Sequence, residues 1–135
     1  MEVVERRRML REEAVRQARE FLGSVKPLLG KLSAALIGSY ARGDFNEWSD
    51  IDLLIVSEEF DPNPLRRWNG IIEAVSKYPG VEPILLTPRE FLRQVRLGTP
   101  MAEEALGRGI VLADELGIFK VARDMRGRAS DAGRI

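Results

Sequence analysis

The sequence contains neither cysteine nor histidine. Without cysteine the chain can form no disulfide bond, offers no thiol nucleophile and cannot build a cysteine-ligated zinc site. Without histidine it lacks the usual general base at neutral pH and the commonest ligand of transition metals. Any catalysis by this chain must therefore use carboxylates, hydroxyl groups, lysine, arginine and hard metal ions.

Long apolar runs and an excess of one charge are also missing. No apolar run approaches the roughly 18 residues of a membrane-spanning helix, and the N-terminal stretch MEVVERRRML is too acidic and too poor in apolar residues for a signal peptide. The 21 basic and 21 acidic residues cancel, so net charge gives no general attraction to nucleic acid or to an anionic membrane. We therefore expect a cytoplasmic protein that does not enter membranes and does not bind nucleic acid directly.

The 135 residues are enough for one ordinary domain with one hydrophobic core. Hydrophobic residues make up 44% of the chain and charged residues 31%, which is typical of a globular domain. We expect a single domain over residues 1–125, with a catalytic core over about 25–115. Residues 126–135 have almost nothing to bury and are expected to form a disordered tail.

Periodic apolar residues, separated by glycine, proline and small polar residues, predict alternating helices and strands. We expect helices over residues 3–22, 65–77, 100–107 and 115–125 and a further helix that begins at Pro88, with strands over 31–38, 50–57, 81–87 and 109–114. This order indicates an α/β domain with a mixed sheet of about four strands flanked by helices.

Turn and cap residues define some of these boundaries. Gly23, followed by Pro27, predicts the end of the first helix. Thr87 and Glu90 have the spacing of a capping box, which predicts a helix start. Pro83 has no amide hydrogen to donate, so at least one side of its strand should lack a neighbour at that position.

Two aspartates at the start of the second predicted strand are the first sign of chemistry. Residues two apart in a strand point to the same side, so Asp50 and Asp52 present their carboxylates on one face while Ile51 enters the core. Two adjacent negative charges are costly unless a cation neutralises them. Oxygen ligands favour Mg²⁺ or Mn²⁺, and paired carboxylates at a strand end suit a two-metal site for phosphoryl transfer.

Gly38 and Ser39 lie just upstream, where the first predicted strand ends and a short helix is expected to begin. Such a junction exposes backbone N–H groups and a hydroxyl group, which can hold phosphate. Glycine at position 38 lets the backbone approach a ligand closely. A triphosphate at Gly38 and Ser39, bridged by metal to Asp50 and Asp52, would make one coherent site.

The stretch GSYARGDFNEWSDIDLLIV resembles the signature of the minimal nucleotidyltransferases, a branch of the DNA polymerase beta superfamily. The family pattern is Gly-Ser-x-Ala-Arg-Gly, a short spacer, and then Ser-Asp-aliphatic-Asp-aliphatic. Ten residues separate Ser39 from Asp50, which is the family spacing. Every defining position is filled, by Gly38, Ser39, Ala41, Arg42, Gly43, Ser49, Asp50, Ile51, Asp52 and Leu53.

The resemblance implies transfer of a nucleoside monophosphate, AMP from ATP in our reading, to a hydroxyl group with release of pyrophosphate. It also implies a third carboxylate on a neighbouring strand, and Glu82 in VEPILLT is the best match. Many family members have aspartate at this place. Asp50, Asp52 and Glu82 would then hold two Mg²⁺ ions, with Mn²⁺ as the alternative, and Glu82 would act as the base toward the acceptor hydroxyl.

Several residues keep two interpretations. Gly38, Ser39, Arg42 and Ser49 are assigned to nucleotide and phosphate binding, but Arg42 could instead pair with an aspartate and orient it. Ser49 could instead cap or orient the aspartate loop. Glu82 could be a solvated residue of a strand edge. Trp48 is expected to pack beside the loop, with a platform for base stacking as the alternative.

Three functions are compatible with the pattern. The small size favours the antitoxin-like partner of a HEPN-domain ribonuclease toxin, which would silence the toxin by adding AMP to one of its tyrosines. The second is a nucleotidyltransferase for a small hydroxylated molecule, and the third is a non-catalytic module that uses the fold to dock a partner. Self-association as a homo-oligomer remains open in each case.

Overall fold

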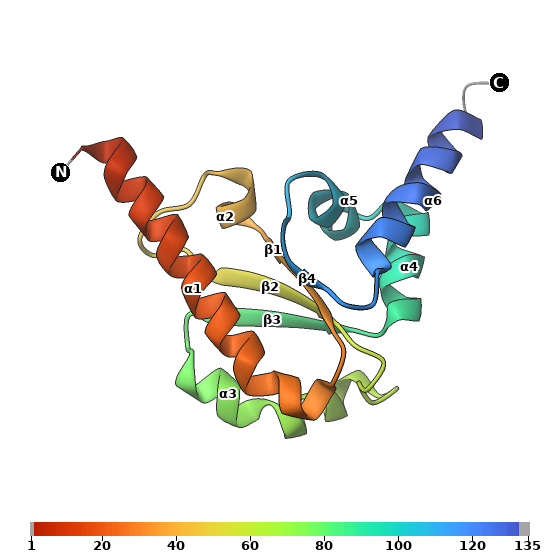
Figure 1. The fold of residues 1–135 in the computed structure, drawn as a ribbon, viewed down its shortest axis with the longest axis horizontal. Helices are drawn as coiled ribbons and strands as arrows, with labels where there is room; N and C mark the ends of the chain where they lie inside the picture. Colours follow the sequence, from red (N-terminus) through yellow and green to blue (C-terminus); the bar gives the residue numbers. More distant parts are fainter. Residues whose placement is uncertain (1, 133–135) are drawn as a thin grey trace.

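The computed structural model of the protein describes residues 2–132, and within them four strands form one sheet. The strands are β1 (Ser33–Ile37), β2 (Ile51–Val56), β3 (Val81–Leu86) and β4 (Ile110–Asp114), in the spatial order β3-β2-β1-β4 (Figure 1). β1 pairs in the antiparallel sense with β2 and β4, and β2 pairs with β3 in parallel. The α/β class and the mixed four-stranded sheet are confirmed.

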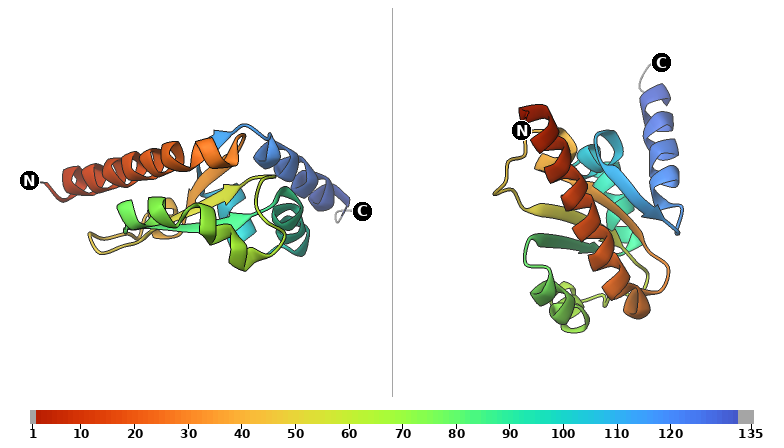
Figure 2. Two further views of the ribbon diagram at one scale, coloured as in Figure 1. Left: turned by 90° about the horizontal axis from the view of Figure 1, so that it is seen from below. Right: turned by 60° about the vertical axis from the view of Figure 1, so that its left-hand side comes forward.

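Helices cover both faces of this sheet (Figures 1 and 2). One face packs against α1 and α3, and the other against α4, α5 and α6. A short α2 follows β1, and a 3-10 helix precedes α3. The bounds are α1 (Val3–Leu29), α2 (Ser39–Arg42), the 3-10 helix (Pro64–Gly70), α3 (Ile72–Lys77), α4 (Pro88–Leu97), α5 (Pro100–Gly107) and α6 (Ile118–Ala132).

The central strand β2 is buried on both sides. Leu53 and Ile55 belong to the core beneath α1, whereas Leu54 and Val56 belong to the core beneath α4, α5 and α6. All four side chains are fully shielded from solvent. A strand covered on both faces needs an apolar residue at every position, which explains the uninterrupted apolar run after Asp52.

Helix α1 is longer than the sequence predicts. It continues past Gly23 and includes Pro27, because Val25 and Leu29 still contribute buried side chains to the core. Gly23 and Pro27 both lie on the exposed side of the helix. The carbonyl of Gly23, which would accept the amide hydrogen that Pro27 lacks, can therefore be solvated instead. Within residues 2–132, no helix is long and apolar enough to cross a membrane.

The predicted helix over 65–77 is two elements rather than one. The 3-10 helix ends at Gly70 and α3 begins at Ile72. With three residues per turn in place of 3.6, the apolar spacing no longer forms one inward face, and Leu65 is 81% exposed. Arg67 is buried instead, where it donates a hydrogen bond to the carbonyl of Leu85 at 2.9 Å and forms an ion pair with Glu90 at 2.7 Å.

Two local predictions at β3 and α4 are confirmed. β3 is an edge strand, so the missing amide hydrogen of Pro83 breaks no ladder on its free side. Thr87 and Glu90 form the capping box at the start of α4: the Thr87 hydroxyl accepts from the Glu90 amide at 3.3 Å, and the Glu90 carboxylate accepts from the Thr87 amide at 2.9 Å.

The C-terminal helix corrects the predicted tail. The last helix begins at Ile118 rather than at residue 115, and it continues through Ala132 into the segment expected to be disordered. Phe119 is fully buried and packs edge-to-face on Phe91 of α4, with ring centroids 5.4 Å apart. Arg126 forms an ion pair with Glu103 of α5 at 3.4 Å, so α6 contacts α5 through charges as well as through apolar side chains. Residues 133–135 lie outside the described part of the chain.

Candidate active site

The end of the sheet where β1 finishes and β2 and β3 begin brings the predicted site residues together. In the strand register, Ile37 pairs with Asp52 and Asp52 pairs with Glu82. Gly38 directly follows Ile37, and Asp50 directly precedes β2. Residues that are up to 44 positions apart in the sequence thus lie within one short stretch of the sheet edge.

The carboxylates at this edge raise one another's pKa. Burial raises the pKa of Asp52, which is half-buried, and the charges of Asp50 and Glu104 raise it further, while Arg42 opposes them. Glu82 is exposed, and its pKa is raised mainly by the charge of Asp50, then by desolvation and the charge of Asp52. The local field therefore favours a proton or a cation at this place.

These residues offer a suitable donor set for a divalent cation. Carboxylate oxygens are the ligands that Mg²⁺ and Mn²⁺ prefer, and the mutual repulsion of Asp50, Asp52 and Glu82 is the imbalance that a cation would relieve. Within residues 2–132, however, no three such side chains already converge on one point as a finished metal site. The carboxylates lie near one another, and their side chains would have to converge to share an ion.

Gly38 has a backbone that only glycine adopts readily. Its φ is 75° and its ψ is −152°, a region almost confined to glycine. A Cβ atom built on Gly38 would lie 2.1 Å from Oδ2 of Asp52. The glycine therefore lets the backbone pass directly beside the Asp52 carboxylate, in addition to the close approach to a ligand that the sequence suggests.

A fourth carboxylate, Glu104 of α5, occupies the space in front of Gly38. Its Oε1 atom accepts a hydrogen bond from the N–H of Gly38, and its Oε2 atom lies 3.0 Å from Nη1 of Arg42. Arg42 also contacts Asp44 at 3.3 Å through Nε. Arg42 therefore forms ion pairs with one aspartate, Asp44, and with Glu104.

Sequence reasoning did not find Glu104. It is 66 residues from Gly38 in the chain, on a helix whose pattern shows no functional motif. The only available signal was a pair of adjacent glutamates, Glu103 and Glu104, after the helix start. Such pairs are common on exposed helix faces, so the contact could be found only from the folded chain.

The loop between α2 and β2 is held by its own polar groups. The hydroxyl of Ser49 accepts from the amide of Asn46 at 2.9 Å, and the amide of Ser49 donates to the carbonyl of Asn46 at 3.1 Å. Ser49 therefore orients the aspartate loop in the described structure. Trp48 is 85% exposed, so the expectation that it packs beside the loop is wrong.

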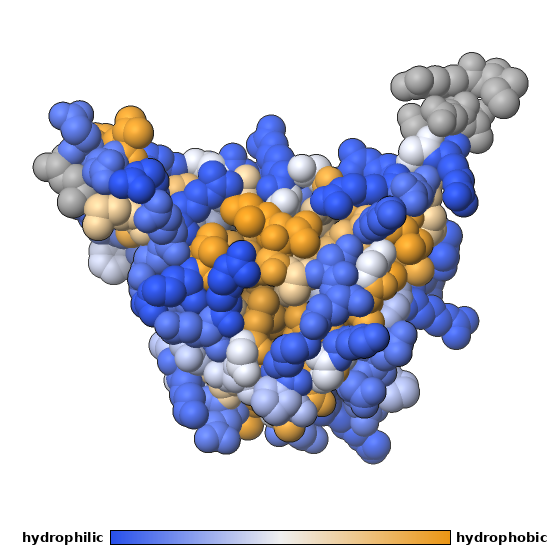
Figure 3. All heavy atoms as spheres, in the orientation of Figure 1, coloured by the Kyte–Doolittle hydropathy of each residue, from blue (hydrophilic) through white to orange (hydrophobic). Residues whose placement is uncertain are grey.

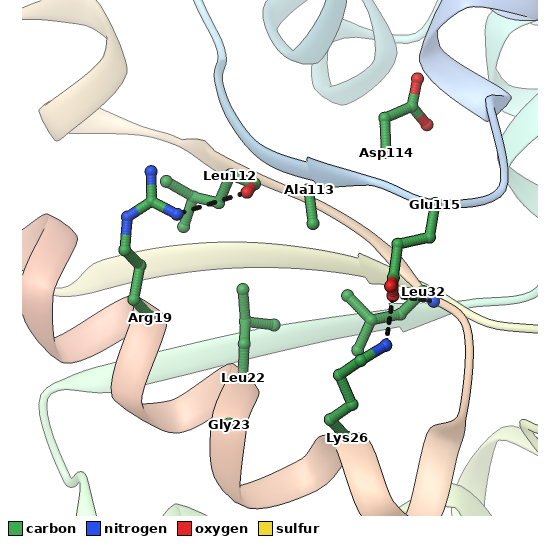
Figure 4. Close-up of a pocket in the computed structure, with 9 residues that line it drawn as sticks. All are labelled: Arg19, Leu22, Gly23, Lys26, Leu32, Leu112, Ala113, Asp114 and Glu115. Carbon is green, nitrogen blue, oxygen red and sulfur yellow. Dashed lines mark hydrogen bonds and ion pairs between the residues drawn. The ribbon is translucent and has the colours of Figure 1, made fainter.

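A separate hollow lies between α1 and the edge strand β4. Figure 4 shows Leu22 and Lys26 of α1 facing Leu112 and Glu115 across it, and its volume is about 420 Å³. Lys26 forms an ion pair with Glu115. Figure 3 shows apolar residues exposed on the face of the molecule that carries this hollow. None of the carboxylates described above lines it, so it is not part of the candidate active site.

Similarity to known proteins identifies the chain as a nucleotidyltransferase. A model of the nucleotidyltransferase domain matches residues 15–111, and the chain therefore belongs to this family of enzymes. It is similar to two proteins of Methanocaldococcus jannaschii, each named "Putative protein adenylyltransferase". The first is 31% identical over 100 residues, which cover 73% of this chain and 97% of the relative. The second is 35% identical over 78 residues, which cover 53% of each chain.

Solved structures support the same fold. A "putative nucleotidyltransferase" from Sulfolobus solfataricus is 26% identical, with a TM-score of 0.56 over 64% of this chain and 78% of that chain. A toxin–antitoxin structure with AMP-PNP gives a TM-score of 0.56 at 18% identity, over 89% of this chain and 92% of that chain. A mutant of the toxin–antitoxin MntA-HpeT gives 0.56 at 16% identity. The last two identities are low, so these two matches show a shared fold.

Proposed function

We propose that the protein transfers AMP from ATP to a tyrosine hydroxyl of a HEPN-domain toxin partner and so acts as an antitoxin in the cytoplasm. The observation that carries the proposal is the meeting of Gly38 with Asp50, Asp52 and Glu82 at one end of the sheet. The names of the two relatives support a protein as the acceptor. The toxin–antitoxin structures of the same fold support a toxin as the partner.

In this proposal each residue has a defined task. The N–H of Gly38, the hydroxyl of Ser39 and the guanidinium of Arg42 bind the triphosphate, and Ser49 keeps the aspartate loop in place. Asp50, Asp52 and Glu82 would hold two Mg²⁺ ions, or Mn²⁺ in their place, which would neutralise negative charge on the reacting phosphates.

The chemical step is an exchange of one bond at phosphorus. The acceptor oxygen bonds to the α-phosphorus of ATP, the bond from that phosphorus to the bridging oxygen breaks, and pyrophosphate leaves. Glu82 takes the proton of the acceptor hydroxyl, because the chain has no histidine and Glu82 is an exposed carboxylate opposite Asp52 on the neighbouring strand. Its exposure leaves room for a side chain of another protein to approach.

The test is a transfer assay with the protein encoded by the adjacent gene. The purified chain, Mg²⁺ and ATP labelled at the α-phosphate are incubated with that protein, and a parallel reaction uses label at the γ-phosphate. Transfer to the partner from the α-label alone, lost when the acceptor tyrosine is changed to phenylalanine, is the expected result. Label on a small molecule would favour the second function considered above, and no transfer to any acceptor would favour a non-catalytic docking module.

A further inference from the structure

The carboxylate of Glu104 lies where the proposed function needs a phosphate. It accepts a hydrogen bond from the N–H of Gly38 and forms an ion pair with Arg42 at 3.0 Å. Both contacts are charge-assisted, which is the stronger class of hydrogen bond. Glu104 therefore uses the same two donors that the proposed function assigns to the triphosphate.

We propose that Glu104 is a built-in competitor of the nucleotide: its carboxylate holds the Gly38 N–H and Arg42 until the triphosphate displaces it, and it thereby sets the nucleotide affinity of the site. This inference rests on the proposed function, since it assumes that Gly38 and Arg42 bind phosphate. One N–H cannot fully serve a carboxylate and a phosphate oxygen at the same time, and the two anions would also repel each other.

The exchange requires movement of one side chain only. Ala102 and Ala105 of α5 are buried and fix the helix on the sheet, whereas the side chain of Glu104 is 21% exposed. Glu104 can therefore turn toward solvent without a shift of α5. After that turn Arg42 loses its shorter ion pair and can donate to the phosphates.

Whether removal of Glu104 strengthens or weakens nucleotide binding shows whether Glu104 competes with the nucleotide or helps to bind it. If Glu104 competes, the apparent dissociation constant of the wild type exceeds that of the open site by the ratio of occupied to open forms. An occupied form that is favoured by about tenfold would weaken binding by about tenfold. If Glu104 instead holds Arg42 ready for phosphate, its removal would weaken nucleotide binding.

The experiment compares wild type with Glu104→Ala by calorimetric titration. The probe is Mg²⁺ with α,β-methylene-ATP, which cannot undergo transfer, and no acceptor is present. We expect Glu104→Ala to bind the probe about tenfold more tightly than wild type. Glu104→Gln should fall between them, because its amide oxygen can still accept from Gly38 but carries no charge for Arg42. Inorganic tripolyphosphate should show the same order, because the competition concerns phosphate rather than base.

Glu103→Ala is the matched control. Glu103 is the next residue on α5 and pairs with Arg126 at 3.4 Å, so this change removes the same charge and leaves the Gly38 contact intact. Its affinity should stay near that of wild type, and thermal melts should show that each variant is folded. Equal or weaker binding by Glu104→Ala, or equal tightening by Glu103→Ala, would overturn the inference and leave the proposed function standing. If neither wild type nor Glu104→Ala binds the analogue, the proposed function itself fails.

Discussion

Replacing Gly38 by alanine should damage the site more than the fold. The backbone of Gly38, at φ 75° and ψ −152°, costs a residue with a Cβ atom on the order of 1–3 kcal/mol. The new methyl group would also lie 2.1 Å from Oδ2 and 3.0 Å from Cγ of Asp52. Since Cβ atoms do not approach other atoms so closely, the carboxylate of Asp52 must turn away from its position.

Gly30→Ala is a control with nearly the same backbone. Gly30 has φ 60° and ψ −131°, and an added Cβ atom would meet no heavy atom within 4 Å. This variant should therefore lose on the order of 1–3 kcal/mol of unfolding free energy and keep its catalytic geometry. Gly38→Ala should lose at least as much stability, because it adds the clash with Asp52.

The assay has two parts, urea denaturation for stability and single-turnover AMP transfer under conditions where both variants are folded. We expect Gly30→Ala to transfer at nearly the wild-type rate. Gly38→Ala should be slower by roughly 100-fold, the loss typical of a catalytic group displaced by about 1 Å. If Gly38→Ala transfers as fast as Gly30→Ala, Asp52 has not moved, and the steric reasoning is wrong.

Three further predictions concern the carboxylates. Asp50→Asn and Asp52→Asn should each abolish transfer in a folded protein, whereas Asp124→Asn on α6 should not; retained transfer in either site variant would contradict the metal assignment. Glu82→Gln should bind the Mg²⁺–nucleotide complex nearly normally but transfer AMP roughly 10²–10⁴-fold more slowly. Glu82→Asp should recover part of that rate. A wild-type transfer rate in Glu82→Gln would show that Glu82 is not part of the site. Because the folded state raises the pKa of Asp52, its ionisation disfavours folding: without divalent ions, the unfolding free energy should decrease as pH rises from the ordinary aspartate pKa through the raised value. Asp52→Asn should flatten that part of a pH series of urea denaturations, and an unchanged slope would refute the assignment.

The parts of the site that the sequence predicts are those set by local geometry. Asp50 lies close enough to Asp52 to raise its pKa, as the alternation of strand residues predicts, and Gly38 directly precedes the short helix α2. The position of Glu82 depends on a second feature, the pairing of β3 with β2. The parallel register of these strands places Glu82 opposite Asp52. Each of these depends on a strand and its immediate neighbour.

The predictions that failed depend on contacts between distant segments. α1 continues through Pro27 because the sheet offers a buried place for Leu29, which periodicity within the helix cannot reveal. The helix predicted over residues 65–77 is not one helix, and the apolar Leu65 at its start is exposed while the buried Arg67, paired with Glu90, takes the inward side of the 3-10 turn. Local pattern decides between helix and strand, whereas the direction of each side chain also depends on what packs against it.

Glu104 makes the candidate active site more negative than the three strand carboxylates alone. Asp50, Asp52 and Glu82 already repel one another, and Glu104 adds a fourth negative charge that also raises the pKa of Asp52. Arg42 is shared between Glu104 and Asp44, so it cannot balance this group alone. A triphosphate would bring still more negative charge to the same place. On the proposed function, we therefore expect the site to bind the nucleotide together with its divalent cations, since the cations would offset the charge of the strand carboxylates while the phosphates replace the carboxylate at Gly38.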